Sequence, residues 1–161
     1  MKIMVVSDTH KNFQALKNAV DKNKDMDLMI HLGDGEHEFG DVRSLNPTIP
    51  MIYIGGNVDF GTHRMTHVVD AKGVKIFCTH GHLYNVHDGL DLLVQEAKKN
   101  GCKIALYGHT HLYRTEIVNG VFVMNPGSLD SPRNHNKPTY GVIQLSDNGE
   151  IKMNIMAMDR R

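Results

Sequence analysis

Five short apolar segments of this 161-residue chain each end beside a glycine or other small residue and a side chain that can bind a metal ion. They span residues 2–6, 27–32, 51–54, 74–78 and 104–107. Short, continuous apolar runs of this kind are typical of strands that are buried on both faces of a sheet. The carboxyl ends of parallel strands gather at one edge of an α/β sheet, where such proteins place their ligand sites. The pattern therefore predicts that the polar residues after these segments lie together.

The other patterns predict helices outside the sheets and hairpins toward the carboxyl end. Residues 11–22 and 89–100 carry apolar side chains at helical spacing. Turn signals between apolar segments predict three hairpins, at residues 72–73, 119–120 and 147–150. Because hairpins are antiparallel, mixed sheets are favoured over an all-parallel doubly wound sheet. We expect one domain over residues 1–161, with residues 36–45 and 59–66 as loops that shape the substrate site.

The composition narrows the class of protein. Lys and Arg together number 18, as do Asp and Glu, and this zero net charge argues against an extended nucleic-acid or membrane-binding surface. No apolar stretch approaches the ~20 residues that span a bilayer, and the amino-terminal apolar run is too short for a signal peptide. Cys78 and Cys102 lie inside apolar runs and indicate buried thiols rather than a disulfide. We expect a cytoplasmic protein with no membrane association, and its size is compatible with a homo-oligomer.

The residues after the five segments form one chemically consistent set of candidate metal ligands. They are Asp8, His10, Asp34, Asn57, His80, His109 and His111. Carboxylate, carboxamide and imidazole groups without thiolate suit divalent ions such as Mn²⁺, Mg²⁺, Fe²⁺ and Zn²⁺. The set is too large for one ion that also keeps water, and it fits two ions ~3.5–4 Å apart with a bridging carboxylate and a hydroxide between them. Two such cations would clamp a phosphate and activate the water that attacks it.

Taken one at a time, these motifs have ordinary structural interpretations. Asp8 before a predicted helix is commonly an N-cap, a Gly-Asp pair after a strand is usually a turn, and His-x-His occurs by chance. The metal-site interpretation is favoured because all of the motifs occur together, in this order and each at the end of a strand.

The same motifs resemble those of the calcineurin-like metallophosphoesterases. They are Asp8-x-His10, Gly33-Asp34, Gly56-Asn57, Thr79-His80-Gly81-His82 and Gly108-His109-Thr110-His111. The short chain and the Asn-Pro-Gly-Ser at residues 125–128 are similar to the small single-domain prokaryotic phosphodiesterases of that superfamily. The resemblance implies an α/β fold, a four-layer α/β/β/α sandwich of two mixed sheets flanked by helices.

The resemblance also implies how the ligands divide between two metal ions. One ion would take Asp8, His10, Asp34 and His111, and the other would take Asp34, Asn57, His80 and His109. Asp34 would then bridge the two ions. Mn²⁺ is the metal we expect, with Ni²⁺, Mg²⁺, Zn²⁺ and Fe²⁺ as alternatives. The implied enzyme is a phosphoesterase, more specifically a phosphodiesterase, in which a hydroxide bridging the two ions attacks the phosphorus of a small phosphate ester.

The sequence departs from the commonest pattern of the superfamily directly after Asn57. Many relatives carry a histidine there that helps to protonate the leaving oxygen, whereas Val58 has no donor. We therefore assign catalytic roles to Asn57 and His82, with His37 as an alternative donor. In an extended segment, His82 would face the same way as His80. Without the usual acid, we expect a preference for substrates with good leaving groups.

Two rival functions can be weighed against this one. A non-catalytic metal-binding scaffold, such as the retromer subunit that resembles this fold, would have little reason to keep every ligand position filled. A metallo-β-lactamase-like hydrolase would show a compact His-x-His-x-Asp-His cluster, which this sequence does not contain. The complete ligand set favours the phosphoesterase.

The remaining polar residues are given more modest roles. His31 lies inside the second apolar segment and is expected to donate a hydrogen bond to a ligand carboxylate. Gly127-Ser128 is expected to form a turn, and Arg133 to be a solvated loop residue rather than a phosphate ligand. Histidines in polar stretches are expected at the surface: His37, His63, His67, His87 and His135.

Overall fold

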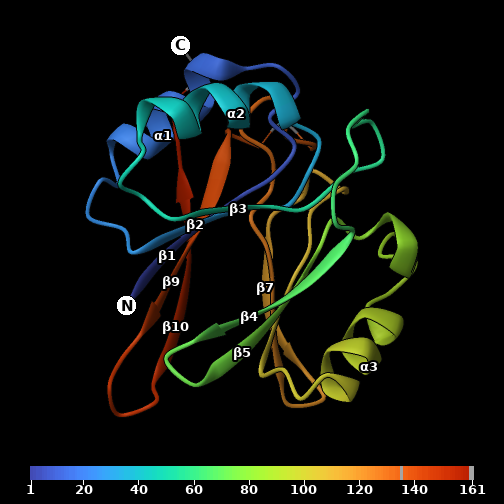
Figure 1. Cartoon of the computed structure of the whole chain (residues 1–161). Helices are drawn as coiled ribbons and strands as arrows, with labels where there is room; N and C mark the ends of the chain where they lie inside the picture. The colour runs from blue at the N-terminus through green and yellow to red at the C-terminus, as the bar shows by residue number, and fades with distance from the viewer. Residues whose placement is uncertain (135, 160–161) are drawn as a thin grey trace.

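Two five-stranded mixed sheets pack face to face in the computed structural model, which describes residues 1–134 and 136–159 (Figure 1). The first sheet has the order β10-β9-β1-β2-β3, with β1 Lys2–Val6, β2 Leu28–His31, β3 Met51–Tyr53, β9 Thr139–Leu145 and β10 Ile151–Ala157. The second has the order β4-β5-β6-β8-β7, with β4 Thr66–Ala71, β5 Val74–Thr79, β6 Ile104–Leu106, β7 Arg114–Val118 and β8 Val121–Asn125. His135, which we expected at the surface, lies outside the described residues.

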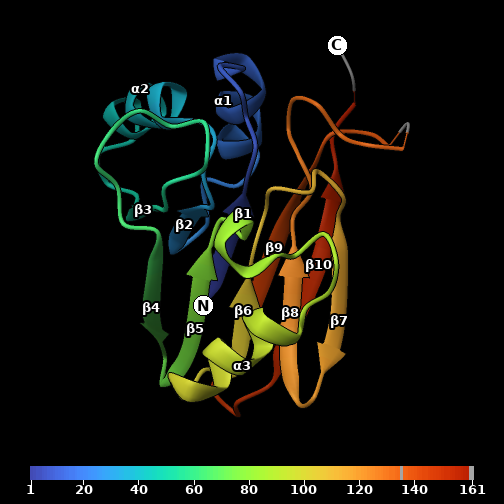
Figure 2. The same ribbon diagram turned by 90° about the vertical axis from the view of Figure 1, so that its right-hand side faces the viewer.

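Helices cover the outer face of each sheet. They are α1 Phe13–Asp21, α2 Glu36–Leu45 and α3 Asp91–Lys99, together with one 3₁₀ turn, η1 His82–Tyr84. The helices α1 and α2 lie over the first sheet, and Figure 2 shows α3 in front of the second. The side chain of Asn12 begins α1 by accepting a hydrogen bond from the Ala15 N–H at 3.0 Å.

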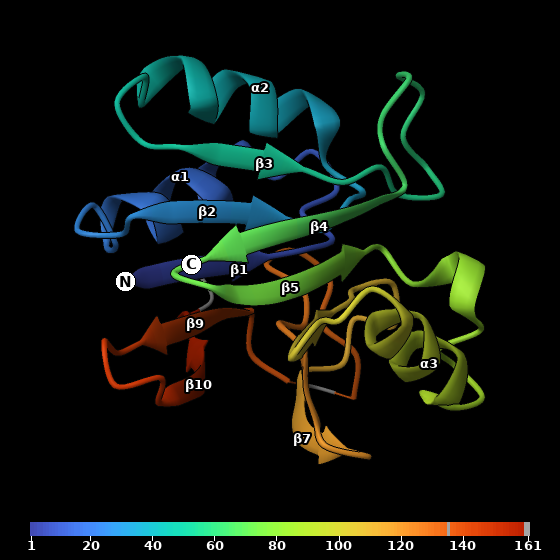
Figure 3. The ribbon, with the colours of Figure 1, turned by 60° about the horizontal axis from the view of Figure 1, so that its bottom comes forward.

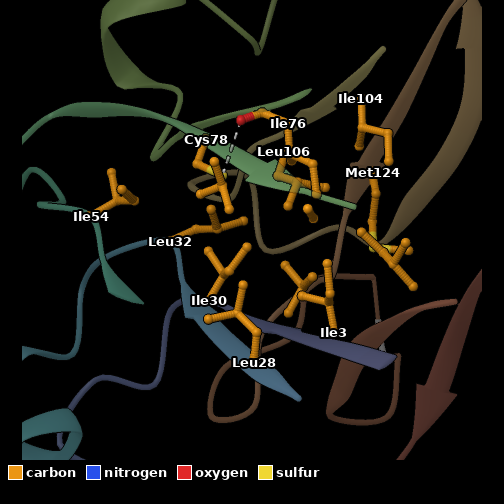
Figure 4. Packing of buried hydrophobic residues seen from close by; sticks show 14 of the residues in the cluster. Ile3, Leu28, Ile30, Leu32, Ile54, Ile76, Cys78, Ile104, Leu106 and Met124 are labelled. Atoms are coloured by element: carbon orange, nitrogen blue, oxygen red, sulfur yellow. Dashed lines mark hydrogen bonds between the residues drawn. The ribbon is translucent and has the colours of Figure 1, made fainter. Parts of the chain in front are cut away.

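Alternating side chains along the strands create the layers. Ile3 and Val5 of β1 are buried between the two sheets, whereas Met4 and Val6 face the opposite side and pack with α1 and α2. Figure 4 shows residues of both sheets meeting in the central layer, with Ile30 on one side and Leu106 on the other. Helix α3 packs on the outer face of the second sheet and forms a third hydrophobic cluster with it. The predicted four-layer α/β/β/α sandwich is confirmed.

The strands that precede the candidate ligands come from both sheets, not from one. The strands β1, β2 and β3 are parallel in the first sheet, and β5 and β6 are parallel in the second. Figure 3 shows the arrowheads of β2, β3 and β5 on the same side of the molecule. A hydrogen bond of 3.0 Å from the backbone N–H of His109 to the side-chain Oδ2 of Asp8 joins the two sheets there. The site is therefore an end of the sandwich, which the sequence pattern alone could not distinguish from an edge of one sheet.

The three predicted hairpins are present as antiparallel pairs, β4–β5, β7–β8 and β9–β10. Both residues of the β7–β8 turn have positive φ, 48° at Asn119 and 81° at Gly120. This is the backbone that a two-residue hairpin turn requires and that Asn-Gly adopts most readily.

One prediction about the connections is wrong, because residues 36–45 form helix α2 rather than a loop. The helix has few apolar residues, and of these Phe39 and Val42 are buried against the first sheet. Gly40 in its middle lowers the helix propensity further. Packing against the sheet overrides these weak local preferences. By contrast, residues 59–65 are irregular, close to the expectation of a loop.

Cys78 and Cys102 are both buried and free, as the sequence indicated. Burial raises the pKa of both thiols, so neither has the thiolate character of a reactive cysteine. Within residues 1–134 and 136–159, no helix is both long and apolar enough to span a bilayer.

Candidate metal centre

The structure brings Asp8, His10 and His111 together at the end of the sandwich. Nε2 of His111 lies 3.2 Å from Oδ1 of Asp8 and 3.2 Å from Nε2 of His10. Nε2 of His10 lies 3.9 Å from the same Asp8 oxygen. Three ligand atoms of the kinds that bind divalent cations therefore face one small volume.

A second group of ligand atoms shares Asp8 and adds Asp34 and His80. Nε2 of His80 lies 3.4 Å from Oδ2 of Asp34 and 4.0 Å from Oδ1 of Asp8. The side-chain oxygen of Asn57 lies 3.0 Å from the same His80 nitrogen. Asp8 thus belongs to both groups, whereas the sequence resemblance implied a bridging role for Asp34.

His109 lies at the margin of the second group. Its ring centroid is 5.1 Å from that of His80, and its side chain is half-buried. His87 is exposed, as expected, and its ring lies 4.9 Å from that of His109, so this histidine also borders the site. All of the candidate ligands are gathered in one region; which of them bind metal stays a prediction.

The tautomers of two histidines show that this region fits cations. Nδ1 of His80 lies 2.7 Å from the carbonyl of Leu32, and Nδ1 of His111 lies 2.8 Å from the carbonyl of Ser131. A carbonyl only accepts, so in the neutral rings both Nδ1 atoms carry the proton. The two Nε2 lone pairs then point at carboxylate oxygens, which also carry lone pairs. Oδ1 of Asp8 is buried without any hydrogen-bond donor among the described residues. A positive ion between these atoms would satisfy all of them.

Protons compete with cations for these atoms. Burial opposes protonation of His80. The hydrogen bond that its protonated ring would donate to Asp34 and the negative charge of Asp8 outweigh burial, so the pKa of His80 is raised. In the same way, the hydrogen bond that a protonated His111 ring would donate to Asp8 raises the pKa of His111. Burial favours the neutral form of Asp8, yet His111 and His80 prevail and lower its pKa. These effects favour the ionised form of Asp8, and any proton held by Nε2 of His80 or His111 must leave when a divalent ion binds there.

Glycines in the ligand loops allow very close approach. A side chain at Gly56 would overlap the carboxylate of Asp34, and one at Gly108 would overlap the hydroxyl of Ser7. This is a physical reason for the glycine that accompanies the ligands in the sequence.

A buried polar network behind the ligands corrects the role expected for His31. Its Nε2 lies 3.0 Å from the hydroxyl of Thr9, and its Nδ1 accepts from the Gly33 N–H at 3.1 Å. The Thr9 hydroxyl donates to the buried carboxylate of Glu38 at 2.5 Å, so His31 donates to Thr9 and not to a ligand carboxylate. Glu38 also accepts from the Lys11 N–H at 2.8 Å. The network fixes the backbone on both sides of Thr9, between two candidate ligands.

The other predicted residues have mixed outcomes. The chain is not extended at His82, because η1 begins there after Gly81 with φ 113°. The His82 ring is nevertheless 5.4 Å from the His80 ring. Gly127 has φ 79°, consistent with the expected turn, and the hydroxyl of Ser128 donates to the carbonyl of Asp8 at 2.7 Å.

Of the other residues expected at the surface, some are exposed and some are half-buried. Arg133 and His37 are exposed, as expected. His63 is instead half-buried and lies 2.8 Å from the carboxylate of Glu36. His67 is half-buried as well.

Two carboxylates that organise the ligand loops were missed from the sequence, Glu38 and Asp59. Glu38 lies in the segment that we interpreted as a loop, so its burial had no visible signal. Asp59 stands two residues after a candidate ligand in Gly-Asn-x-Asp, and this spacing could have drawn attention to it.

A small hollow of about 110 Å³ opens beside the ligands. It is lined by His10, Lys11, Asp34, Gly35, Glu36, His37, Glu38 and Val58. A larger cavity of about 520 Å³ lies between α1 and residues 129–132. It adjoins the candidate ligands through Ser131, whose carbonyl faces His111.

Comparison with known protein families shows to which family the chain belongs. The family model of the calcineurin-like phosphoesterase superfamily domain matches residues 1–148. The chain belongs to this family. The probable metallophosphoesterase YsnB of Bacillus subtilis is 30% identical over 91% of this chain and 86% of its own length. A phosphodiesterase of Methanocaldococcus jannaschii is 29% identical over 79% of this chain and 83% of its own length.

Solved structures share the fold. A conserved protein of Streptococcus pneumoniae, described as a predicted phosphoesterase, has a TM-score of 0.79 at 23% identity, covering 98% of this chain and 97% of its own. Vps29 of Entamoeba histolytica, solved with zinc, has a TM-score of 0.73 at 19% identity, covering 98% and 99%. At these identities the likeness shows the fold alone, and enzyme and scaffold must be distinguished by the chemistry of the site.

Burial of His31 predicts a pH-dependent contribution to stability. Burial lowers its pKa from 6.5 to about 4, so below about pH 6.5 the unfolded chain binds a proton that the folded chain does not. Stability contributed by neutral His31 is therefore full at pH 7 and is lost as the pH falls toward 4. From pH 7 to pH 5 the loss should be about 2 kcal/mol.

Urea unfolding of the metal-free protein at both pH values tests this. The difference in unfolding free energy between wild type and His31→Gln should shrink by about 2 kcal/mol on acidification. His37→Gln, at an exposed position on α2, is the matched control for the loss of a histidine side chain. A difference between wild type and His31→Gln that stays constant with pH would contradict the assignment of a neutral buried ring.

Proposed function

We propose that the protein is a phosphodiesterase that uses two divalent cations. The observation that carries the proposal is the arrangement of lone pairs: two histidine Nε2 atoms point at buried carboxylate oxygens, one of which has no donor. The membership of the calcineurin-like phosphoesterase family supports it, as does the similarity to a named phosphodiesterase of Methanocaldococcus jannaschii. The expected substrate is a small phosphate ester, and the expected compartment is the cytoplasm.

The proposed ligands divide as the family resemblance implies. One ion would be held by Asp8, His10, Asp34 and His111, and the other by Asp34, Asn57, His80 and His109. When bound, two divalent ions would lower the pKa of a shared water and neutralise charge on the phosphate. Mn²⁺ is our first choice because the oxygen and imidazole donors suit it, with Ni²⁺, Mg²⁺, Zn²⁺ and Fe²⁺ as alternatives.

The chain itself orients its donors before any ion binds. The carbonyls of Leu32 and Ser131 hold the rings of His80 and His111, which fixes the nitrogen that each presents. Asn57 is exposed, so its carboxamide can complete the site from the solvent side. His82 is half-buried, and its Nδ1 is buried without a partner among the described residues. We propose that His82 donates a hydrogen bond to substrate.

Val58 explains which substrates should react well. Its side chain is 49% exposed and lines the hollow beside His10 and Asp34. It offers no donor to a leaving oxygen. Esters whose leaving group departs without protonation should therefore be hydrolysed best, since a general acid typically contributes ~10²–10⁴-fold.

Replacement of proposed ligands tests the function. Asp34→Asn and His109→Ala should each lower the Mn²⁺-dependent hydrolysis of bis(p-nitrophenyl) phosphate by at least ~10²-fold, because each removes a donor to a cation. The rate of nitrophenolate release measures it. Asp41→Asn, at an exposed site on α2, is the matched control and should keep the wild-type rate.

Two outcomes would contradict the proposal in different ways. Unchanged rates in both ligand variants would show that the activity arises elsewhere. A wild-type protein that binds Mn²⁺ but hydrolyses no phosphomonoester, aryl diester or cyclic nucleotide would instead favour the scaffold.

A histidine placed at position 58 should restore part of the general-acid contribution. Val58→His should raise the kcat/KM for a phenyl or alkyl diester by up to ~10²-fold, with a smaller gain on the p-nitrophenyl ester. The ratio of the two substrates in a Mn²⁺ assay measures the change. Val58→Ala is the control for the change in shape, and equal ratios in the two variants would contradict this interpretation.

A further inference from the structure

One carboxylate outside the proposed ligand set binds the backbone of two ligand loops at once. Oδ2 of Asp59 accepts from the Asp34 N–H at 3.0 Å and from the Gly56 N–H at 2.7 Å. Oδ1 of Asp59 accepts from the Gly35 N–H at 3.1 Å. The first loop follows β2 and the second follows β3, so Asp59 ties Asp34 to the residue before Asn57.

Tyr53 strengthens the same connection from the end of β3. Its hydroxyl donates to Oδ2 of Asp59 at 2.7 Å and accepts from the Gly35 N–H at 2.9 Å. Its ring packs against those of Phe39 and His31, with centroid distances of 4.8 Å and 5.0 Å. The hydroxyl therefore has a fixed place between the two loops.

The backbone at Asp34 needs such support. It has φ 58°, directly after Gly33 with φ 107°, and a residue with a side chain is disfavoured in this left-handed region. The Val58 N–H donates in return to Oδ1 of Asp34 at 3.1 Å. Each loop thus supplies a carboxylate that binds the backbone of the other.

The partners of Asp59 explain why a carboxylate is required there. All of them donate: four backbone N–H groups, of Asp34, Gly35, Glu36 and Gly56, and one hydroxyl. An ionised carboxylate only accepts, and its charge strengthens each bond. An asparagine would present its own N–H group to one of these donors.

We propose that Asp59 is a positioning residue that holds Asp34 and Asn57 in place for the ion that these two residues share. The inference rests on the proposed function, because it presumes that this pair binds metal. Asp59 has no hydrogen bond to Asp8, His10 or His111 among those of the described residues. Both ions share Asp34, but only one of them also uses Asn57, so the loss of Asp59 should weaken that site more than the other.

Mn²⁺ titrations followed by the EPR signal of free Mn²⁺ test this on the full chain. Wild type should bind two equivalents, and Asp59→Asn should bind one of them ~10–100-fold more weakly, with a smaller loss at the other ion, which shares Asp34 but not Asn57. Asp59→Glu, which keeps the charge, should recover part of the loss.

Asp70→Asn is the matched control. Asp70 also accepts a backbone hydrogen bond, from the Gly73 N–H at 2.9 Å, but it lies at the β4–β5 turn, away from every proposed ligand. This variant should keep both Mn²⁺ affinities. If Asp59→Asn does not fold, as judged by circular dichroism, Tyr53→Phe replaces it and should weaken the same site by ~3–10-fold.

Two results would overturn the inference: unchanged Mn²⁺ affinities in Asp59→Asn, or equal weakening of both sites, which would show only a general support of the fold. A wild type that binds no Mn²⁺ would overturn the proposed function and this inference with it. A wild type that binds two equivalents without hydrolysing any ester would overturn the proposed activity alone, and the Asp59 variants would still decide the inference.

Discussion

The buried carboxylate of Asp8 is the interaction on which the rest of the site depends. Its N–H donates to the carbonyl of Gly33 at 3.0 Å, its carbonyl accepts from Ser128 at 2.7 Å, and its Oδ2 accepts from the His109 N–H at 3.0 Å. Only Oδ1 has no donor among the described residues, and it lies 3.2 Å from Nε2 of His111. A buried anion is costly unless it is paired, so this oxygen marks the place where positive charge belongs.

The hydrogen-bond partners of Asp8 explain why the site depends on how the two sheets pack against each other. Asp8 itself follows β1, and its partners come from the loop after β2 in the same sheet and from the loops after β6 and β8 in the other sheet. A shift of one sheet against the other would therefore break the site before it exposed the core. Cation binding should in turn stabilise the sandwich, since the unfolded chain cannot hold these donors together.

The sequence correctly predicted that the candidate ligands gather in one region, because each follows a strand whose burial is apparent from the local sequence, as in Ile3 to Val6 before Asp8. It failed where the deciding contact is distant in the chain. The helical state of residues 36–45 and the burial of Glu38 depend on packing against the first sheet, and the partner of His31 depends on Thr9, 22 residues away. Asp59 lay within a motif, but the fact that it binds the loop of Asp34 could be seen only once β2 and β3 were paired.

Asp8 and its neighbours are proposed to hold two divalent cations. Equilibrium dialysis of the full chain against Mn²⁺, with Asp8→Asn as the variant and Asp41→Asn as its exposed control, tests this proposal most directly. Wild type and control should each bind two Mn²⁺ per chain, and Asp8→Asn should lose at least one, because the neutral amide cannot offset the cation charge. Equal Mn²⁺ binding by all three proteins, or no binding by wild type, would contradict it.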